Sequence, residues 1–155
     1  MLACALLLFA AASMAAEFVG YVINVADGDT ITVVNLKGQQ LRVSLAGIDA
    51  PERGQQFFKQ STAYLTKLVR RQKVLILWHN KDRYGRMVGV VILNGRDINL
   101  EQIRAGCAWW DREYTKEQSA GDQMDYELAE KAAQAQRLGL WVDPSPVPPW
   151  EWRRH

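Results

Sequence analysis

The first part of the chain alternates apolar and polar residues with a period of two, which is typical of β-strands. The alternation covers residues 18–25, 30–34 and 40–47, and turn-forming sequences interrupt it at Asp27-Gly28 and at residues 35–38. Short turns between such segments favour antiparallel pairing. The sequence therefore predicts three consecutive antiparallel strands.

In the third of these segments the two strand faces differ in character. Leu41, Val43 and Leu45 alternate with Arg42 and Ser44. Because successive side chains of a strand point to opposite faces, we expect the three apolar residues to face the core. Arg42 and Ser44 then share the other face.

A helix and two further strands follow. Pro51 ends the third strand, and residues 55–70 carry apolar side chains at helical spacing. Residues 73–78 and 87–93 are strand candidates, and residues 82–86 form the hairpin connection between them. The chain then has five strands, with a helix between the third and the fourth.

The last third of the chain favours helices. We expect one helix at residues 98–105, stopped by Gly106, and another at residues 122–136, stopped near Gly139. The proline-rich residues 143–155 are predicted to be an extended tail. The whole pattern describes an α+β protein: a five-stranded OB-like Greek-key β-barrel with about three covering helices.

Composition agrees with a folded domain. The chain has 155 residues, of which 48% are hydrophobic and 23% charged, which suits a single domain with a real core at residues 17–142. The formal net charge is +2. This weak positive charge permits a polyanionic partner but does not argue for one.

Residues 1–16 differ from the rest because they are uncharged and built mainly from Ala and Leu, with Phe9 among them. Ser13-Met14-Ala15 fits the small-x-small pattern of a signal-peptidase site, so we expect a cleaved signal peptide and a secreted or periplasmic protein. The apolar stretch is too short for a stable membrane span. An uncleaved anchor and a buried N-terminal helix are the alternatives. Cleavage would remove Cys4 and leave Cys107, which we expect to be buried and unreactive.

Three short polar segments carry the candidate chemistry: residues 27–30 (DGDT), residues 48–52 (IDAPE) and residues 82–86 (DRYGR). Each follows or separates predicted strands. Carboxylates at strand ends, with arginines arriving from a separate hairpin, are the groups needed to hold a hard cation against a phosphate. This combination favours phosphodiester chemistry.

With these three segments and Arg104-Ala105-Gly106, in this order and spacing, residues 18–141 resemble the staphylococcal nuclease homologues, or thermonuclease-like proteins. The resemblance implies the OB-like barrel. It also implies a Ca²⁺-dependent nuclease that hydrolyses DNA and RNA, favours single strands and leaves 3′-phosphate ends. We expect the protein to be a monomer.

The resemblance places metal ligands at Asp29 and Asp49 and adds the backbone carbonyl of Ala50. Calcium takes several oxygen ligands, so at least two carboxylates are expected. The alternative is that the acidic residues around Gly28 only form a turn, because Asp often caps its own backbone. Asp27 is assigned to that turn.

The resemblance also implies the two main catalytic side chains. Glu52 matches the glutamate that orients or deprotonates the attacking water, although a Glu in this position also suits a helix N-terminus. Arg86 matches the arginine that stabilises the transition state. A guanidinium holds two phosphoryl oxygens at once and keeps its charge.

Several residues are candidates for substrate contact. Arg83 and Tyr84 match positions that contact a substrate phosphate, with an ordinary solvated hairpin as the alternative. Tyr114 falls near a position on which a base stacks. Trp109 and Trp110 are either further stacking surfaces or core residues.

The chain departs from the family pattern at Ser44, where the family usually has a second phosphate-binding arginine. A serine supplies one neutral hydrogen bond and no charge. Arg42 lies two residues earlier on the same face, about 7 Å away by the rise of a strand. We therefore include Arg42 among the catalytic residues, on the hypothesis that its side chain reaches along the face and replaces the missing arginine.

Three functions follow from this sequence. The first is the calcium-dependent nuclease. The second, favoured by Ser44, is a catalytically impaired OB-fold module that binds nucleic acid. The third is a barrel that binds an oligosaccharide or a protein partner, in which the acidic residues only form turns.

Overall fold

Alternating buried and exposed residues form the strands of a barrel. The computed structural model describes residues 15–155 and contains five long strands: β1 (Ala16–Asp27), β2 (Thr30–Asn35), β3 (Gln40–Leu45), β5 (Lys73–Lys81) and β6 (Met87–Leu93). The signal-peptide prediction falls almost wholly outside the described residues and stays a prediction. From residue 15 onward, no helix has the length and apolar character needed to cross a membrane.

The five strands close on themselves. β1 pairs with β2 and β5, β2 with β3, and β5 with β6, all antiparallel. A parallel pairing of β3 with β6 completes the barrel, with Val43 opposite Met87 and Leu45 opposite Gly89. Val43 and Leu45 are fully buried while Arg42 is exposed, as the alternation predicts. The predicted OB-like α+β fold is confirmed.

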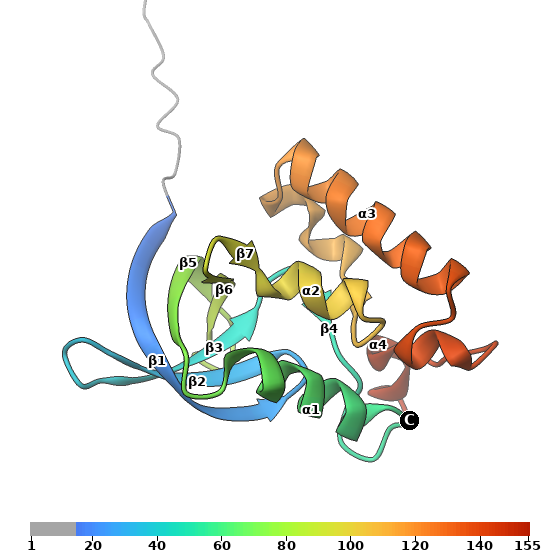
Figure 1. Cartoon of the computed structure of the whole chain (residues 1–155), viewed down its shortest axis with the longest axis horizontal. Coiled ribbons are helices and arrows are strands. Elements are labelled where there is room, and N and C mark those ends of the chain that lie inside the picture. The colour runs from blue at the N-terminus through green and yellow to red at the C-terminus, as the bar shows by residue number, and fades with distance from the viewer. Residues whose placement is uncertain (1–14) are drawn as a thin grey trace, which may run out of the picture.

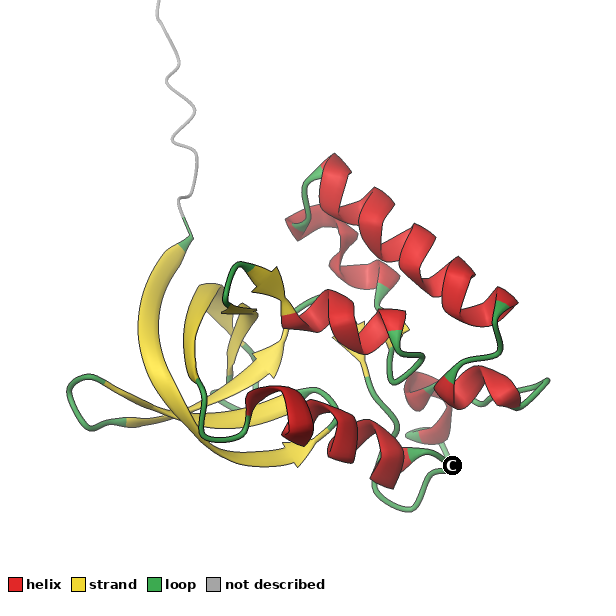
Figure 2. Cartoon of the chain, in the orientation of Figure 1, coloured by secondary structure: helices red, strands yellow, loops and turns green. Residues whose placement is uncertain are grey.

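Three helices lie on one side of the barrel (Figures 1 and 2): α1 (Phe58–Val69), α2 (Ile98–Arg104) and α3 (Ala120–Ala135). α2 packs on β6 and carries α3 on its other side. Gly106 follows the cap of α2 with φ +66°, as expected for its predicted stop. The first helix starts later than predicted, because Phe57 has a left-handed φ of 66° and ends the preceding turn.

Several short elements carry no periodic pattern and were not predicted. They are the paired strands β4 (Ile48–Asp49) and β8 (Trp109–Trp110), the short strand β7 (Arg96–Asp97), the 3₁₀ helices η1 (Arg112–Glu117) and η2 (Gly139–Val142), and the helix α4 (Pro149–Trp152). The β4–β8 pair fixes the position of Asp49, because it places this residue opposite Trp109.

The prediction of an extended tail at residues 143–155 is wrong for its last part. Pro149 begins the one-turn helix α4, a position where the missing N–H of proline costs nothing. The Pro149 side chain is buried, and the Trp150 ring packs edge-on against Trp109 with 6.3 Å between ring centres. The tail is therefore folded against the rest of the protein.

Candidate active site

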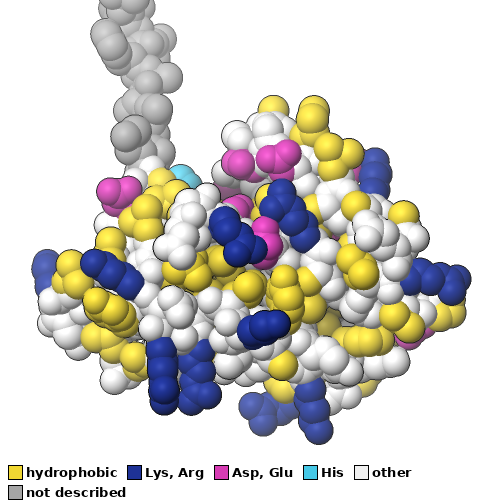
Figure 3. Space-filling model, in the orientation of Figure 1, with side chains coloured by type: hydrophobic (Ala, Val, Ile, Leu, Met, Phe, Trp, Pro, Cys, Tyr) yellow, Lys and Arg dark blue, Asp and Glu magenta, His cyan; other side chains and the backbone are white. Residues whose placement is uncertain are grey.

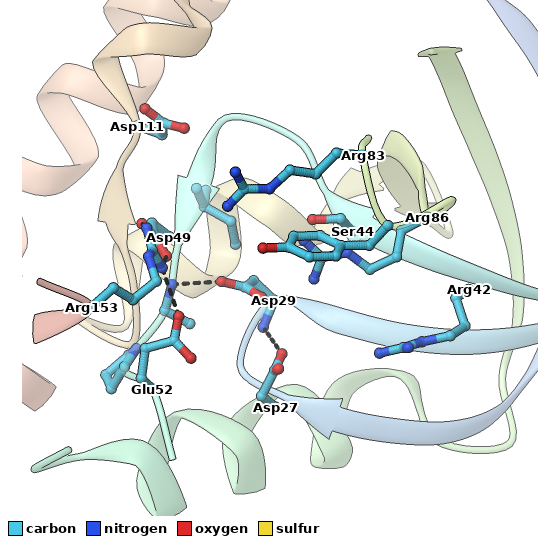
Figure 4. A pocket seen from close by; sticks show the side chains of 14 residues that line it. Asp27, Asp29, Arg42, Ser44, Asp49, Glu52, Arg83, Arg86, Asp111 and Arg153 are labelled. Atoms are coloured by element: carbon cyan, nitrogen blue, oxygen red, sulfur yellow. Dashed lines mark hydrogen bonds and ion pairs between the residues drawn. The ribbon is translucent and has the colours of Figure 1, made fainter. Parts of the chain in front are cut away.

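The three polar segments meet in one cleft of about 580 Å³. It lies between the barrel and the last residues of the chain (Figure 4). Its lining includes nine of the ten predicted site residues, all except Tyr114: Asp29, Arg42, Ser44, Asp49, Ala50, Glu52, Arg83, Tyr84 and Arg86. Asp27, Ile48, Pro51, Asp111 and Arg153 complete it.

Asp29 joins the first polar segment to the second. Asp27 behaves as a turn residue, because its Oδ1 accepts the backbone N–H of Asp29 at 3.1 Å. The carboxylate of Asp29 instead accepts the N–H of Ala50 at 2.7 Å, across 21 residues of sequence. Gly28 lets this turn approach α1 closely, since a Cβ there would lie 1.8 Å from Ser61 Oγ. Asp29 is thus more than a turn former.

Burial and mutual repulsion make these carboxylates costly to ionise. Burial, followed by the negative charge of Asp27, raises the pKa of Asp29 well above its usual range. Burial also raises the pKa of Asp49, although hydrogen bonds from Arg153 oppose this effect. A bound cation would relieve both costs.

The acidic part of the lining suits a hard cation, because Asp29 and Asp49 offer carboxylate oxygens beside the backbone of Ala50. Within residues 15–155, no three His, Cys, Asp or Glu side chains lie close enough together to hold a metal ion. Asp29 and Asp49 would therefore bind a cation together with other oxygens, such as the Ala50 carbonyl, water and a substrate phosphate.

A chain of hydrogen bonds links Arg86 to the carboxylates. Arg86 Nε donates to Asp82 Oδ2 at 2.6 Å, and Arg86 Nη1 donates to the Thr30 hydroxyl at 3.2 Å. Thr30 in turn donates to Asp29 Oδ1 at 3.1 Å. The arginine from the β5–β6 hairpin is thus oriented by the same strand end that presents Asp29.

Asp82 shapes the hairpin that carries Arg86. Its Oδ1 accepts the backbone N–H groups of Tyr84 and Arg86. Partial burial opposes ionisation of Asp82, but the hydrogen bonds from the Arg86 side chain and these two N–H groups outweigh it and lower the pKa. The Tyr84 ring is 66% exposed, and the guanidinium of Arg83 lies 4.9 Å from its centre.

Arg42 and Ser44 lie on the same face of β3 and both line the cleft. Ser44 pairs with Thr30, the residue that accepts a hydrogen bond from Arg86, so it lies beside the strand end that orients Arg86. Figure 4 shows the Arg42 side chain directed into the cleft. Arg42 pairs through its backbone with Thr32, but within residues 15–155 its side chain makes no hydrogen bond or ion pair, so the guanidinium is available to a ligand.

The aromatic candidates separate into two groups. Tyr114 is half-buried in η1 and lines a neighbouring pocket of about 290 Å³, which shares Ser44 and Arg86 with the main cleft. Trp109 and Trp110 are only 6% and 7% exposed. The interpretation that bases stack on these two tryptophans is therefore wrong, and both belong to the core.

Arg153 was not predicted as a site residue. Its Nη2 donates to Asp49 Oδ2 at 2.7 Å, and its Nη1 donates to Asp49 Oδ1 at 3.1 Å and to Glu52 Oε1 at 2.6 Å. These hydrogen bonds, first those with Asp49, raise the pKa of Arg153. The sequence offers no periodic signal for this contact, because it joins residues more than 100 positions apart through a proline-rich segment.

Two buried amides of α2 support the cleft from behind. Asn99 Nδ2 donates to the carbonyls of Ala46 and Gly89, and Gln102 Nε2 donates to that of Gly28 at 2.6 Å. Both side chains are fully buried. Their sequence signal is a pair of polar residues three apart on an otherwise apolar helix face.

Comparison with known proteins agrees with this geometry. The model of the staphylococcal nuclease homologue family matches residues 42–143. A micrococcal nuclease of Shigella flexneri is 45% identical over 148 residues, which cover 90% of this chain and 82% of the relative. An uncharacterized endonuclease of Haemophilus influenzae is 38% identical, covering 86% and 71%, and one of Escherichia coli O157:H7 is 36% identical, covering 96% and 93%. The chain belongs to the staphylococcal nuclease homologue family.

Proposed function

We propose that this protein is a Ca²⁺-dependent nuclease that cleaves DNA and RNA, prefers single strands and leaves 3′-phosphate ends. Membership of the family makes the chain a hydrolytic nuclease. The proposal adds the cation, the substrate form and the product ends. One observation carries it: Asp29, Asp49 and Glu52 line the same cleft as Arg86, which arrives from a separate hairpin.

The residues divide the work of hydrolysis between them. Asp29 and Asp49, with the Ala50 carbonyl, would hold the cation, which when bound polarises a phosphoryl oxygen and acidifies water. Glu52 accepts the proton of the attacking water. Arg86 donates to the phosphoryl oxygens as negative charge builds on them, and its hydrogen bonds to Asp82 and Thr30 fix its direction. Cleavage of the bond between phosphorus and the 5′ oxygen leaves a 3′-phosphate and a 5′-hydroxyl.

The preference for single strands rests on Tyr84 and Arg83. Tyr84 presents an exposed aromatic ring at the edge of the cleft, and only an unpaired base can stack on such a ring. On the face shown in Figure 3, Lys and Arg side chains stand in separate groups rather than in one continuous basic surface. Binding should therefore depend mainly on the cleft itself.

The leader-like residues 1–16 support the further proposal that the enzyme acts after export, and we propose that it acts as a monomer. A second function has one observation in its favour. Ser44 leaves the cleft without the usual second arginine, which would suit a module that binds nucleic acid but cleaves it poorly.

The test is cleavage of labelled, heat-denatured DNA by the purified protein, with Ca²⁺ or with a chelator. We expect cleavage only with Ca²⁺, and we expect Glu52→Gln to lower turnover about 10²- to 10⁴-fold through loss of the base. Glu127→Gln, on the exposed side of α3, is the matched control and should behave as the unsubstituted protein. A 3′-phosphate is recognised by products that a polymerase extends only after phosphatase treatment.

Cleavage that persists in the chelator would contradict the calcium dependence. Binding of DNA without cleavage under both conditions would select the second function. Products that a polymerase extends directly would show that the ends are 3′-hydroxyls.

A further inference from the structure

The guanidinium of Arg153 bridges two carboxylates that the proposed reaction uses for different purposes. It contacts both oxygens of Asp49, the metal ligand, and one oxygen of Glu52, the base. The Asp49 side chain is only 14% exposed, so few water molecules can replace this partner. A planar guanidinium is suited to such a bridge, because its N–H groups point in fixed directions.

The segment that carries Arg153 is held in place by two further contacts. Trp150 packs edge-on against the buried Trp109, the residue paired with Asp49 in the β4–β8 ladder. The side chain of Gln55 donates to the Val147 carbonyl and accepts the backbone N–H of Glu52 at 2.9 Å. The tail is thus tied to the Asp49 strand on one side and to the Glu52 loop on the other.

These contacts leave the reactive oxygens of the carboxylates available. Each carboxylate oxygen can accept about two hydrogen bonds or ligands, and Arg153 takes one place on each oxygen of Asp49. Within residues 15–155, Glu52 Oε2 accepts no hydrogen bond. In Figure 4, Arg153 lies on the opposite side of Asp29 from Arg86, and both arginines line the cleft.

We propose that Arg153 is a positioning residue of the active site. It fixes the Glu52 carboxylate relative to Asp49, so that Oε2 is aimed at the attacking water while Asp49 still binds the cation. It also places a positive charge among carboxylates that would otherwise repel one another. The last turn of the chain is then a working part of the nuclease site.

The inference rests on the proposed function, because Glu52 and Asp49 have these roles only in that reaction. Its test compares Arg153→Ala, Arg153→Lys and Arg154→Ala in the full chain. Arg154 is the matched control: it is the next residue, it is exposed, and its removal changes the net charge equally. Steady-state cleavage of denatured DNA is measured with saturating Ca²⁺.

We expect Arg153→Ala to lower kcat about 10- to 100-fold while KM changes less than threefold, since the base is misplaced but the substrate contacts remain. Arg153→Lys should recover only part of the lost kcat, because an ammonium keeps the positive charge but lacks the planar pair of N–H donors that bridges two carboxylates. Arg154→Ala should match the unsubstituted protein. Unchanged kcat in Arg153→Ala would overturn the proposal, and higher kcat would overturn it by showing that the arginine obstructs the site.

A second measurement does not need activity, so it separates failure of this inference from failure of the proposed function. The urea midpoint of unfolding is measured in chelator for Arg153→Ala, Asp49→Asn and the double variant. If the bridge exists in solution, Arg153→Ala lowers the urea midpoint at most half as much in the Asp49→Asn protein as in the unsubstituted protein. Equal losses in both backgrounds would overturn the inference, whatever the unsubstituted protein does to DNA.

Discussion

At the scale of single residues, Thr30 connects the two halves of the site. Its hydroxyl accepts from Arg86 and donates to Asp29, and its side chain is fully buried. A buried hydroxyl that both donates and accepts a hydrogen bond is held in one orientation, and it thereby fixes the positions of its two partners. The carboxylate side and the arginine side of the cleft are therefore held in register by one threonine.

Ser44 and Arg42 allow a direct prediction about the missing arginine. The Arg42 side chain lines the cleft and has no partner within residues 15–155, so we expect Arg42→Ala to lower kcat/KM about tenfold through loss of a charged phosphate contact. Ser44→Arg should raise kcat/KM, because it puts a guanidinium opposite Thr30. Both changes are measured by initial rates on denatured DNA.

Arg70→Ala is the control for this pair, since Arg70 is an exposed arginine at the end of α1 and does not line the cleft. If Arg42→Ala cleaves as fast as this control, Arg42 does not replace the missing arginine. The cleft then works with Arg86 as its main phosphate-binding arginine.

At the scale of elements, α2 supports the site. Its N-cap is Asp97, whose Oδ1 accepts the N–H of Leu100 at 3.0 Å. The Oδ2 atom of Asp97 accepts a hydrogen bond from the Tyr126 hydroxyl of α3 at 2.8 Å. Loss of the Tyr126 bond in Tyr126→Phe should cost about 1.5–3 kcal/mol of unfolding free energy, since the acceptor is a carboxylate. Urea unfolding measures this. Tyr64→Phe is the control, because the Tyr64 hydroxyl makes no hydrogen bond within residues 15–155.

The same Asp97 gives a pH prediction. Burial raises the pKa of Asp97, although hydrogen bonds from Leu100 and Tyr126 oppose it. Its favourable contribution is therefore complete below the unfolded pKa, near 3.9, and is lost as the pH rises through the folded value. Asp97→Asn keeps a helix cap and cannot ionise.

The stability of Asp97→Asn relative to the unsubstituted protein should therefore improve steadily between about pH 3 and pH 7. Urea unfolding at several pH values measures the difference. Asp125→Asn, at an exposed position on α3, is the control for the removal of one carboxylate. A constant difference across the range would mean that burial of Asp97 does not affect its ionisation.

The elements also show what sequence could and could not predict. The barrel strands and the three main helices follow from local periodicity, so β6 was predicted to the residue. The cleft could also be predicted, because Asp29, Asp49 and Arg86 lie at strand ends that a barrel brings together. The β4–β8 pair, α4 and Arg153 have no local pattern. Their positions are decided by packing of Trp109 and Trp150, which joins distant parts of the chain.

At the scale of the whole molecule, Cys107 reports on unfolding. It is 8% exposed, and burial raises its pKa to about 11. At pH 8 its thiolate fraction is then on the order of 10⁻³, against roughly 0.2 for an ordinary thiol. In a Cys4→Ser variant, alkylation by iodoacetamide should be at least about 100-fold slower in the native protein than in urea. Mass spectrometry follows the reaction, and equal rates would show that the core around Cys107 is open.

The separation in sequence between Arg153 and its partners also means that Arg153 is synthesised well after them. Asp49 and Arg153 are separated by 104 residues, and a ribosome adds about 5–20 residues per second. About 5–20 s therefore pass between the synthesis of Asp49 and that of Arg153. If Arg153 aims Glu52 as we propose, a growing chain has its barrel and carboxylates before it has an efficient nuclease. Under the proposed function, nucleic acid near a nascent chain would meet the complete site only after residue 153 has been added.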